Sequence, residues 1–187
     1  MKKVLLILPF LLTGCASTNE VVSSSIENTV ASGTSTVQYQ DDKPVTVPKG
    51  SSAYIAYPNE GHDDYKIYVD SAKQTMSVIT KCFKPYLGKL GEADSYQSAR
   101  VEYLKAQKEG YELFILPRIQ SWTDSYTLFT GVADKVSLTL KIYSLKTNSM
   151  LDSVEITGES SRMPGYEKTP MELLEKPLSS VAKTVFV

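Results

Sequence analysis

The only histidine of the chain, His62, lies in the segment Gly61-His62-Asp63-Asp64. An imidazole beside two carboxylates offers the ligands of a metal site or the two partners of a general acid–base pair. Adjacent side chains in a loop do not converge on one ion by themselves, and the sequence has no second histidine to complete a site. We therefore interpret this segment as a solvated polar loop and predict neither a metal nor a cofactor.

Cysteine is the second type of residue with a reactive side chain, and the chain has two, Cys15 and Cys82. A nucleophilic cysteine needs a nearby base or a helix N-terminus to lower its thiol pKa. Cys82 falls near the C-terminal end of an expected helix, beside its apolar face, so the thiolate is disfavoured there. We predict that Cys82 serves as a small buried hydrophobic residue.

Signatures of common enzyme classes are absent from the sequence: it has no nucleophile elbow, zinc-protease motif, phosphate loop or dinucleotide glycine pattern. Carboxylates are available, but their spacing does not bring any two together as an acid–base pair; they include Asp94, Asp124, Asp134, Asp152 and Glu155. We predict that the protein is not an enzyme. The alternative is a small-ligand-binding protein or hydrolase that uses carboxylates at the strand ends.

An aromatic segment from Trp122 to Gly131 occupies a connection where polar turn residues are usual. Aromatic side chains with an exposed edge are favoured in interfaces, so the candidate interaction residues are Trp122, Asp124, Tyr126 and Phe129. In the alternative interpretation, Trp122 continues the preceding strand and covers the end of the sheet, while Asp124 and Asp134 fix the turn backbone.

The overall composition is that of one ordinary globular domain with an additional segment: 187 residues, 42% hydrophobic and 22% charged. Lys and Arg number 20 against 21 Asp and Glu, and the sequence pI is about 5.9. This balance excludes the basic footprint of a nucleic-acid binder. No segment stays apolar for the roughly 18 residues that a membrane-spanning helix requires.

The elements that must position these residues follow from hydrophobic periodicity. Residues 53–57 read as a buried strand, and a helix starts at an expected capping box, Ser71 to Gln74, and ends near residues 85–88. A second helix spans residues 98–109 and stops at Gly110.

The second half of the chain reads as a central strand, a hairpin and a closing helix. Residues 111–119 contain the apolar run of a central strand, and strands near residues 136–142 and 151–158 form an antiparallel hairpin. The closing helix starts at a capping box at Thr169, has an apolar stripe that includes Met171, and should kink at Pro177. The predicted fold is a single α/β (α+β-like) domain with a mixed sheet of about five strands, helices packed on it and a C-terminal hairpin before the closing helix.

The start of the chain has the pattern of a secretory signal peptide: two lysines, a short apolar run and then Leu12-Thr13-Gly14-Cys15. This ending resembles the bacterial lipobox, which implies cleavage before Cys15 and acylation of its thiol. Ala16 in the next position favours the outer membrane over the inner. We predict a signal peptide at residues 1–14, the lipidated cysteine and a flexible tether at 15–49, and a periplasmic domain at 50–187. Within the tether, Val37, Tyr39, Val45 and Val47 offer an alternative short edge strand.

From about residue 48 to its end the chain resembles a family of small proteobacterial lipoproteins that is known only as a domain of unknown function. The resemblance rests on short motifs in a fixed order: Gly110-Tyr111, Ile119 to Asp124, Asp134-Lys135-Val136, Leu151 to Gly158, and Leu173 to Leu178. It implies a compartment and a fold and no catalytic residues. The element order is also similar to the α/β domains of the TolB amino-terminal region and the curli-secretion lipoprotein.

These observations predict a membrane-anchored envelope lipoprotein that acts as a non-enzymatic binding or assembly module. The expected partners are the lipid bilayer, through acylated Cys15, and an envelope protein, but no nucleic acid. A purely structural subunit of a lipoprotein assembly is a further alternative.

Overall fold

In the computed structural model, which describes residues 24–26, 33–41, 43–125, 127–163 and 166–187, a mixed seven-stranded sheet is flanked by helices. Strand β3 pairs in parallel with β6 and β7, and the remaining pairs are antiparallel. The strand order is β1-β2-β9-β8-β7-β3-β6, with β1 at Ser24–Ile26, β2 at Thr34–Tyr39, β3 at Ser52–Ile55, β6 at Lys89–Glu92, β7 at Leu113–Thr123, β8 at Lys135–Ser144 and β9 at Ser149–Glu159.

A small antiparallel hairpin, β4 (Gly61–His62) and β5 (Ile67–Tyr68), lies outside this sheet. The helices are α1 (Ser71–Phe83), the 3-10 turn η1 (Lys84–Tyr86), α2 (Ala99–Lys108), the single turn α3 (Thr127–Thr130) and α4 (Pro170–Val185). No helix in the described part of the chain is both long and apolar enough to cross a bilayer.

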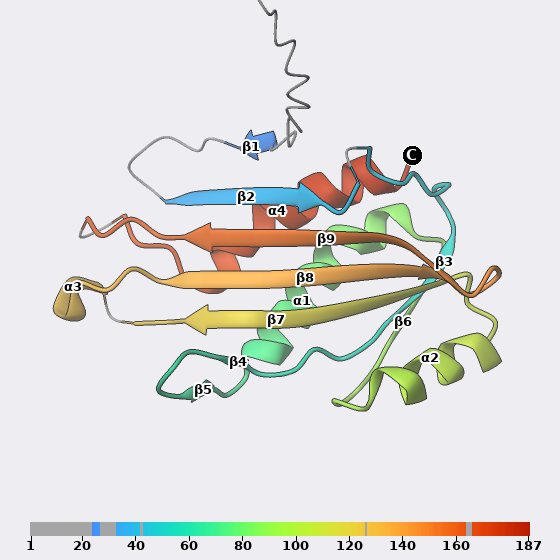
Figure 1. The fold of residues 1–187 in the computed structure, drawn as a ribbon, viewed down its shortest axis with the longest axis horizontal. Coiled ribbons are helices and arrows are strands. Elements are labelled where there is room, and N and C mark those ends of the chain that lie inside the picture. Colours follow the sequence, from blue (N-terminus) through green and yellow to red (C-terminus); the bar gives the residue numbers. More distant parts are fainter. Residues whose placement is uncertain (1–23, 27–32, 42, 126, 164–165) are drawn as a thin grey trace, which may run out of the picture.

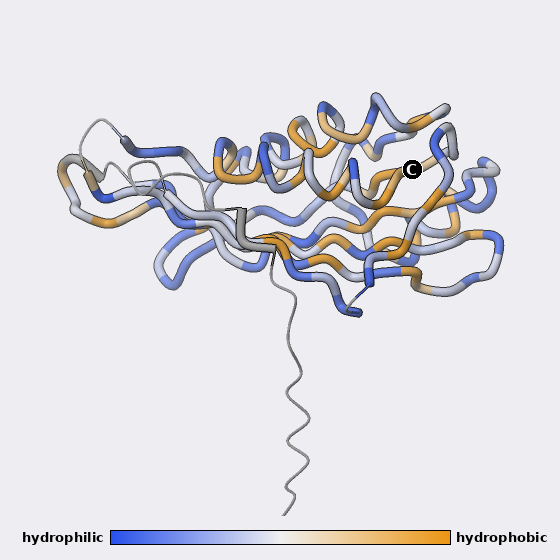
Figure 2. Tube along the Cα trace, turned by 90° about the horizontal axis from the view of Figure 1, so that it is seen from above, coloured by the Kyte–Doolittle hydropathy of each residue, from blue (hydrophilic) through white to orange (hydrophobic). Residues whose placement is uncertain are grey.

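Helices α1 and α4 cover one face of the sheet, as Figures 1 and 2 show. Alternate residues of β8 and β9 point toward these helices. Ile79 and Phe83 of α1 and Leu174 and Leu178 of α4 pack in the same core cluster. On the opposite face, α2 covers only the end near β3 and β7, where Ala106 packs with a cluster that includes Tyr54 and Phe114. This arrangement confirms the predicted single α/β domain, the hairpin and the closing helix. The apolar run of β7 is covered on both faces, as befits a central strand.

The three helices α1, α2 and α4 begin within one residue of their predicted starts. Ser98 accepts a hydrogen bond from the backbone N–H of Val101 at the start of α2, and Thr169 and Glu172 form a complete capping box at the start of α4. The capping box expected at Ser71 is wrong. Residue Asp70 is the N-cap of α1, and the Ser71 hydroxyl binds Glu60 instead.

The prediction of a flexible tether over residues 15–49 is wrong for its described second half. Thr34–Tyr39 is strand β2, which pairs along its whole length with β9, and Val47 pairs with Phe186 near the C-terminus. Both Val37 and Val47 are buried. The alternative of a short strand agrees better with the structure. Strand β2 is not an edge strand, however, because β1 pairs with it. These additions raise the sheet from about five strands to seven.

Helix α4 continues through Pro177 as one helix from Pro170 to Val185. Proline has no N–H to donate to the carbonyl four residues earlier, which here belongs to Leu173. The hydroxyl of Ser35 on β2 donates to that Leu173 carbonyl at 3.1 Å, and the bond is buried. Strand β2 thereby satisfies the acceptor that Pro177 leaves open. Met171, assigned to the apolar stripe, is instead partly exposed.

Replacing Ser35→Ala should lower the free energy of unfolding by about 1–2 kcal/mol, because the buried Leu173 carbonyl loses its donor. In a Pro177→Ala background the new N–H of residue 177 can donate to the same carbonyl, so the cost of Ser35→Ala should shrink. Urea denaturation of the four variants in this cycle measures the coupling. As a control, Ser137→Ala on the outer face of β8 should change stability by less than about 0.5 kcal/mol. Equal costs of Ser35→Ala in both backgrounds would contradict this account.

Candidate functional site

The two crossover connections leave the sheet on opposite faces. The chain passes from β3 through α1 to β6, and then from β6 through α2 to β7, while β6 and β7 lie on either side of β3. Helix α1 packs on one face and α2 on the other. In open α/β sheets, ligands bind in the crevice outside the carboxyl ends of the strands at such a switch in direction.

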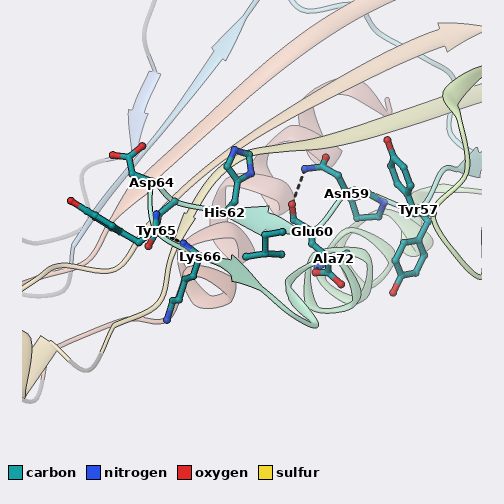
Figure 3. Close-up of a pocket in the computed structure, with 12 residues that line it drawn as sticks. Tyr57, Asn59, Glu60, His62, Asp64, Tyr65, Lys66 and Ala72 are labelled. Atoms are coloured by element: carbon teal, nitrogen blue, oxygen red, sulfur yellow. Dashed lines mark hydrogen bonds between the residues drawn. The ribbon is translucent and has the colours of Figure 1, made fainter.

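An open pocket of about 890 Å³ lies at this edge of the sheet (Figure 3). The loop after β3, the β4–β5 hairpin, the start of α1 and the loop after β6 all contribute to it. Its apolar and aromatic lining residues are Tyr57, Pro58, Tyr65, Ile67, Ala72 and Tyr96, and its polar ones are Asn59, Glu60, His62, Asp63, Asp64 and Lys66.

Two side chains of the loop after β3 build the floor of this site. The Asn59 amide exchanges hydrogen bonds with the backbone of Ile119, accepting at 3.1 Å and donating at 2.9 Å, so the loop is fixed to β7. The Glu60 carboxylate accepts from the Ala72 N–H at 2.9 Å and from the Ser71 hydroxyl at 2.7 Å. Glu60 therefore caps α1 from a distant position and places its negative charge at the positive end of the helix.

The β4–β5 hairpin is closed by Asp63, whose carboxylate accepts from the backbone N–H of Tyr65 at 2.8 Å, from that of Lys66 at 2.9 Å and from the Tyr68 hydroxyl. The Tyr68 hydrogen bond is the main cause that holds the pKa of Asp63 below its usual value. Burial, and then the bond to Asp63, raise the pKa of Tyr68 to about 12. The hairpin lies directly on the sheet end: a Cβ added at Gly61 would collide with Trp122.

Several polar groups on the pocket wall are free of partners in the described part of the chain. They are the hydroxyls of Tyr57 and Tyr65, the His62 imidazole and the Asp64 carboxylate. Burial, followed by the charges of Glu60 and Asp70, raises the pKa of Tyr57. The site thus combines fixed structural groups at its base with unpaired hydrogen-bonding groups and aromatic rings at its surface, which is the composition of a ligand-binding pocket.

The interaction residues predicted from sequence are only partly accessible. The assignment of Trp122 to an exposed surface is wrong, because its side chain is 1% exposed within the core and continues β7, as in the alternative interpretation. Asp124 is exposed, and Phe129 is 84% exposed. Tyr126 and Cys15 lie outside the described residues.

The sequence does not identify Tyr57, Tyr65 and Tyr96 as pocket residues. Aromatic and acidic residues are dense from Glu60 to Tyr68, and this density is a signal that could have indicated the hairpin.

The carboxylates considered for an enzymatic alternative are dispersed. Asp134 is buried and accepts from the backbone N–H of Ser125 at 2.7 Å, and burial is the main cause that raises the pKa of Asp134. Asp152 accepts from the Val45 N–H. None of the five carboxylates named for that alternative lines the pocket, whereas His62 does. Within the described ranges, no group of three His, Cys, Asp or Glu residues could hold a metal. Cys82 is half-buried, and burial raises its thiol pKa.

The fold and the pocket define a small single-domain α/β protein with a mixed sheet and an open crevice at the carboxyl edge of its parallel strands. The chain belongs to the family described as Domain of unknown function (DUF4823), which matches residues 45–185. This confirms the resemblance seen in the sequence. Among curated proteins, none matches the chain.

The solved structures of the PelC dodecamer show the same fold at low sequence identity. The PelC dodecamer from Paraburkholderia phytofirmans is 13% identical with a TM-score of 0.55, and a variant of that dodecamer is 13% identical with a TM-score of 0.57. Each comparison covers 80% of this chain and 94% of the other. Lipoprotein GNA1162 from Neisseria meningitidis is 13% identical with a TM-score of 0.47, covering 71% of this chain and 96% of that one.

Replacing Glu60→Ala should destabilise the domain by about 1–2 kcal/mol, because the first turn of α1 loses its acceptor and its favourable charge. Chemical denaturation followed by circular dichroism measures the change. Glu109→Ala, at the exposed end of α2, is the matched control and should stay within about 0.5 kcal/mol of the parent. If the two variants proved equally stable, the capping role of Glu60 would be wrong.

Proposed function

We propose that this protein is a lipid-anchored envelope lipoprotein whose α/β domain acts as a non-enzymatic binding module. The pocket at the carboxyl edge of β3 and β6 is the observation that carries the binding role. It lies where the fold places ligand sites, and it presents aromatic rings and unpaired polar groups to the outside.

The polar side chains at the pocket base support binding over catalysis. Asn59, Glu60 and Asp63 each hold backbone N–H groups in place, so their oxygens are committed to structure. The groups that remain open toward a ligand, such as Tyr57, Tyr65 and Asp64, suit recognition by contact and hydrogen bonding.

The location in the proposal rests on the sequence around Cys15. Basic residues, a short apolar run and Leu12-Thr13-Gly14-Cys15 support signal cleavage and acylation at the thiol. The neutral Ala16 supports the outer membrane, with the domain on its periplasmic face. Two or more acyl chains provide a stable anchor where one alone binds only marginally.

Cells that express the protein and receive labelled palmitate should incorporate label and retain the protein in the membrane fraction. Cys15→Ser should remove both the label and membrane retention, since the acylated atom is gone. The chain supplies its own matched control, because Cys82→Ser removes the other thiol and should leave both properties intact. An unlabelled, freely soluble wild-type product would refute the anchor.

The binding role is tested by photo-crosslinking in intact cells with a reactive aromatic analogue in place of Tyr65, which is 94% exposed at the pocket. A discrete adduct is expected there and not from the same analogue at Tyr166, which is 51% exposed and does not line this pocket. Adducts between copies of the chain would favour self-assembly, the state described for the PelC dodecamer, as the second candidate function. No specific adduct at Tyr65 would count against the binding role.

A further inference from the structure

We propose that the pocket selects a cationic ligand, namely an ammonium or guanidinium group carried on an apolar body. This inference rests on the proposed binding function and names the ligand class of the same site.

The lining of the pocket is predominantly negative. Glu60, Asp63 and Asp64 contribute three carboxylates, whereas the basic residues of the lining are one lysine, Lys66, and one histidine, His62. Burial is the main cause that raises the pKa of both Tyr57 and Tyr68, and the charges of nearby carboxylates, among them Glu60 at Tyr57 and Asp63 at Tyr68, raise it further. An anionic ligand would be repelled here.

The positive end of helix α1, which would otherwise attract a phosphate or carboxylate, is already occupied. Glu60 accepts the N–H of Ala72 and so neutralises this end from inside the protein. A ligand entering the pocket therefore meets no open helix N-terminus, and Asp63 and Asp64 are the carboxylates that remain to set the local charge. Charge complementarity favours a cation.

Tyrosine rings at this edge already hold cations of the chain itself. The Lys66 ammonium lies 4.1 Å from the centroid of the Tyr68 ring, and the hydroxyl of that tyrosine donates to Asp63. Arg118 lies 5.9 Å from the centroid of the Tyr96 ring and donates to its hydroxyl at 3.0 Å. A cation of the chain thus lies close to a tyrosine ring beside the pocket at Tyr68, and a second cation binds the hydroxyl end of Tyr96.

The remaining tyrosines of the pocket, Tyr57 and Tyr65, have no such cation from the described part of the chain. Figure 3 shows them toward opposite ends of the pocket, with Asp64 beside Tyr65. The Asp64 carboxylate is exposed and has no partner among the described residues. A ligand can therefore pack its apolar body against Ile67 and a tyrosine ring and place its positive end at Asp64.

A volume of about 890 Å³ exceeds what a single small amine fills, so the ligand is an extended one. Two sources carry the required chemistry: a free polyamine, or a lysine-containing or arginine-containing segment of a peptide. Both present an alkyl chain that ends in a positive charge.

The test is isothermal titration calorimetry on the full mature chain in a nonionic detergent, with spermidine and an amidated, acetylated trilysine peptide as separate probes. Maltotetraose and inorganic phosphate serve as neutral and anionic probes. We expect saturable binding of at least one cationic probe at low salt, about tenfold weaker at 0.3 M sodium chloride because exposed charges are screened. Comparison of the two cationic probes distinguishes the polyamine from the peptide source.

Asp64→Asn and Tyr65→Ala should each weaken binding of the cationic probe by about fivefold, a typical loss for one exposed charge or one cation–ring contact. The matched controls are Asp41→Asn and Tyr166→Ala, both exposed outside the pocket, and they should change affinity by less than about twofold. All four positions are on the surface, so the variants should remain folded.

Three results would overturn the cationic class: preferential binding of maltotetraose or phosphate, equal losses in the pocket and control variants, or no binding of either cationic probe. The first leaves the proposed binding role standing with a different ligand. Failure of every probe together with an absence of specific adducts at Tyr65 in cells would remove the binding role as well. A crosslinked partner in cells combined with no cation binding would refute the ligand class alone.

Discussion

The handedness of two connections is the constraint on which this architecture depends. Strand–helix–strand crossovers between parallel strands are right-handed, and β6 and β7 lie on opposite sides of β3. The two crossovers run in opposite directions along the sheet, so right-handed geometry must place α1 and α2 on opposite faces. The loops that follow β3 and β6 therefore separate at their carboxyl ends, and the pocket occupies the space between them. Its existence follows from strand order, while its chemistry follows from the loop residues.

Much of the fold was predictable because local periodicity dominates in its regular elements. The alternation in β8 and β9 and the apolar stripes of α1 and α4 each satisfy one buried face. Strand β2 could be predicted only as an alternative to a flexible tether, because only Val37 and Tyr39 of its six residues suggest a core and its pairing with β9 is a long-range contact. The sequence also does not show what compensates for Pro177 in α4. The Ser35 hydroxyl donates to the Leu173 carbonyl, and these two residues are 138 positions apart.

The candidate site was less predictable than the fold, for two physical reasons. A register shift between Ile119 and Ser121 places both Ile119 and Trp122 on the inner face, so a simple period of two assigns the tryptophan wrongly. The pocket also gathers residues from separate loops, and only the three-dimensional crossover brings Tyr57 and Tyr96 to one wall. The interpretation of Gly61 to Asp64 as a loop is wrong at His62, which lies in strand β4 and pairs with Ile67. The sequence does not show that this hairpin packs against the sheet and brings Tyr65 and Ile67 to the pocket.

The pairing of β1 with β2 sets how far the domain can stray from an acylated Cys15. Nine peptide units separate that cysteine from Ser24, the first residue of β1. Even fully stretched, this span is about 32 Å, close to the hydrocarbon thickness of a bilayer. A tether of the length expected from composition would have allowed several times that distance. The domain would instead work in a shallow layer above the lipid surface, where encounters with other membrane-bound molecules become a two-dimensional search at high effective concentration.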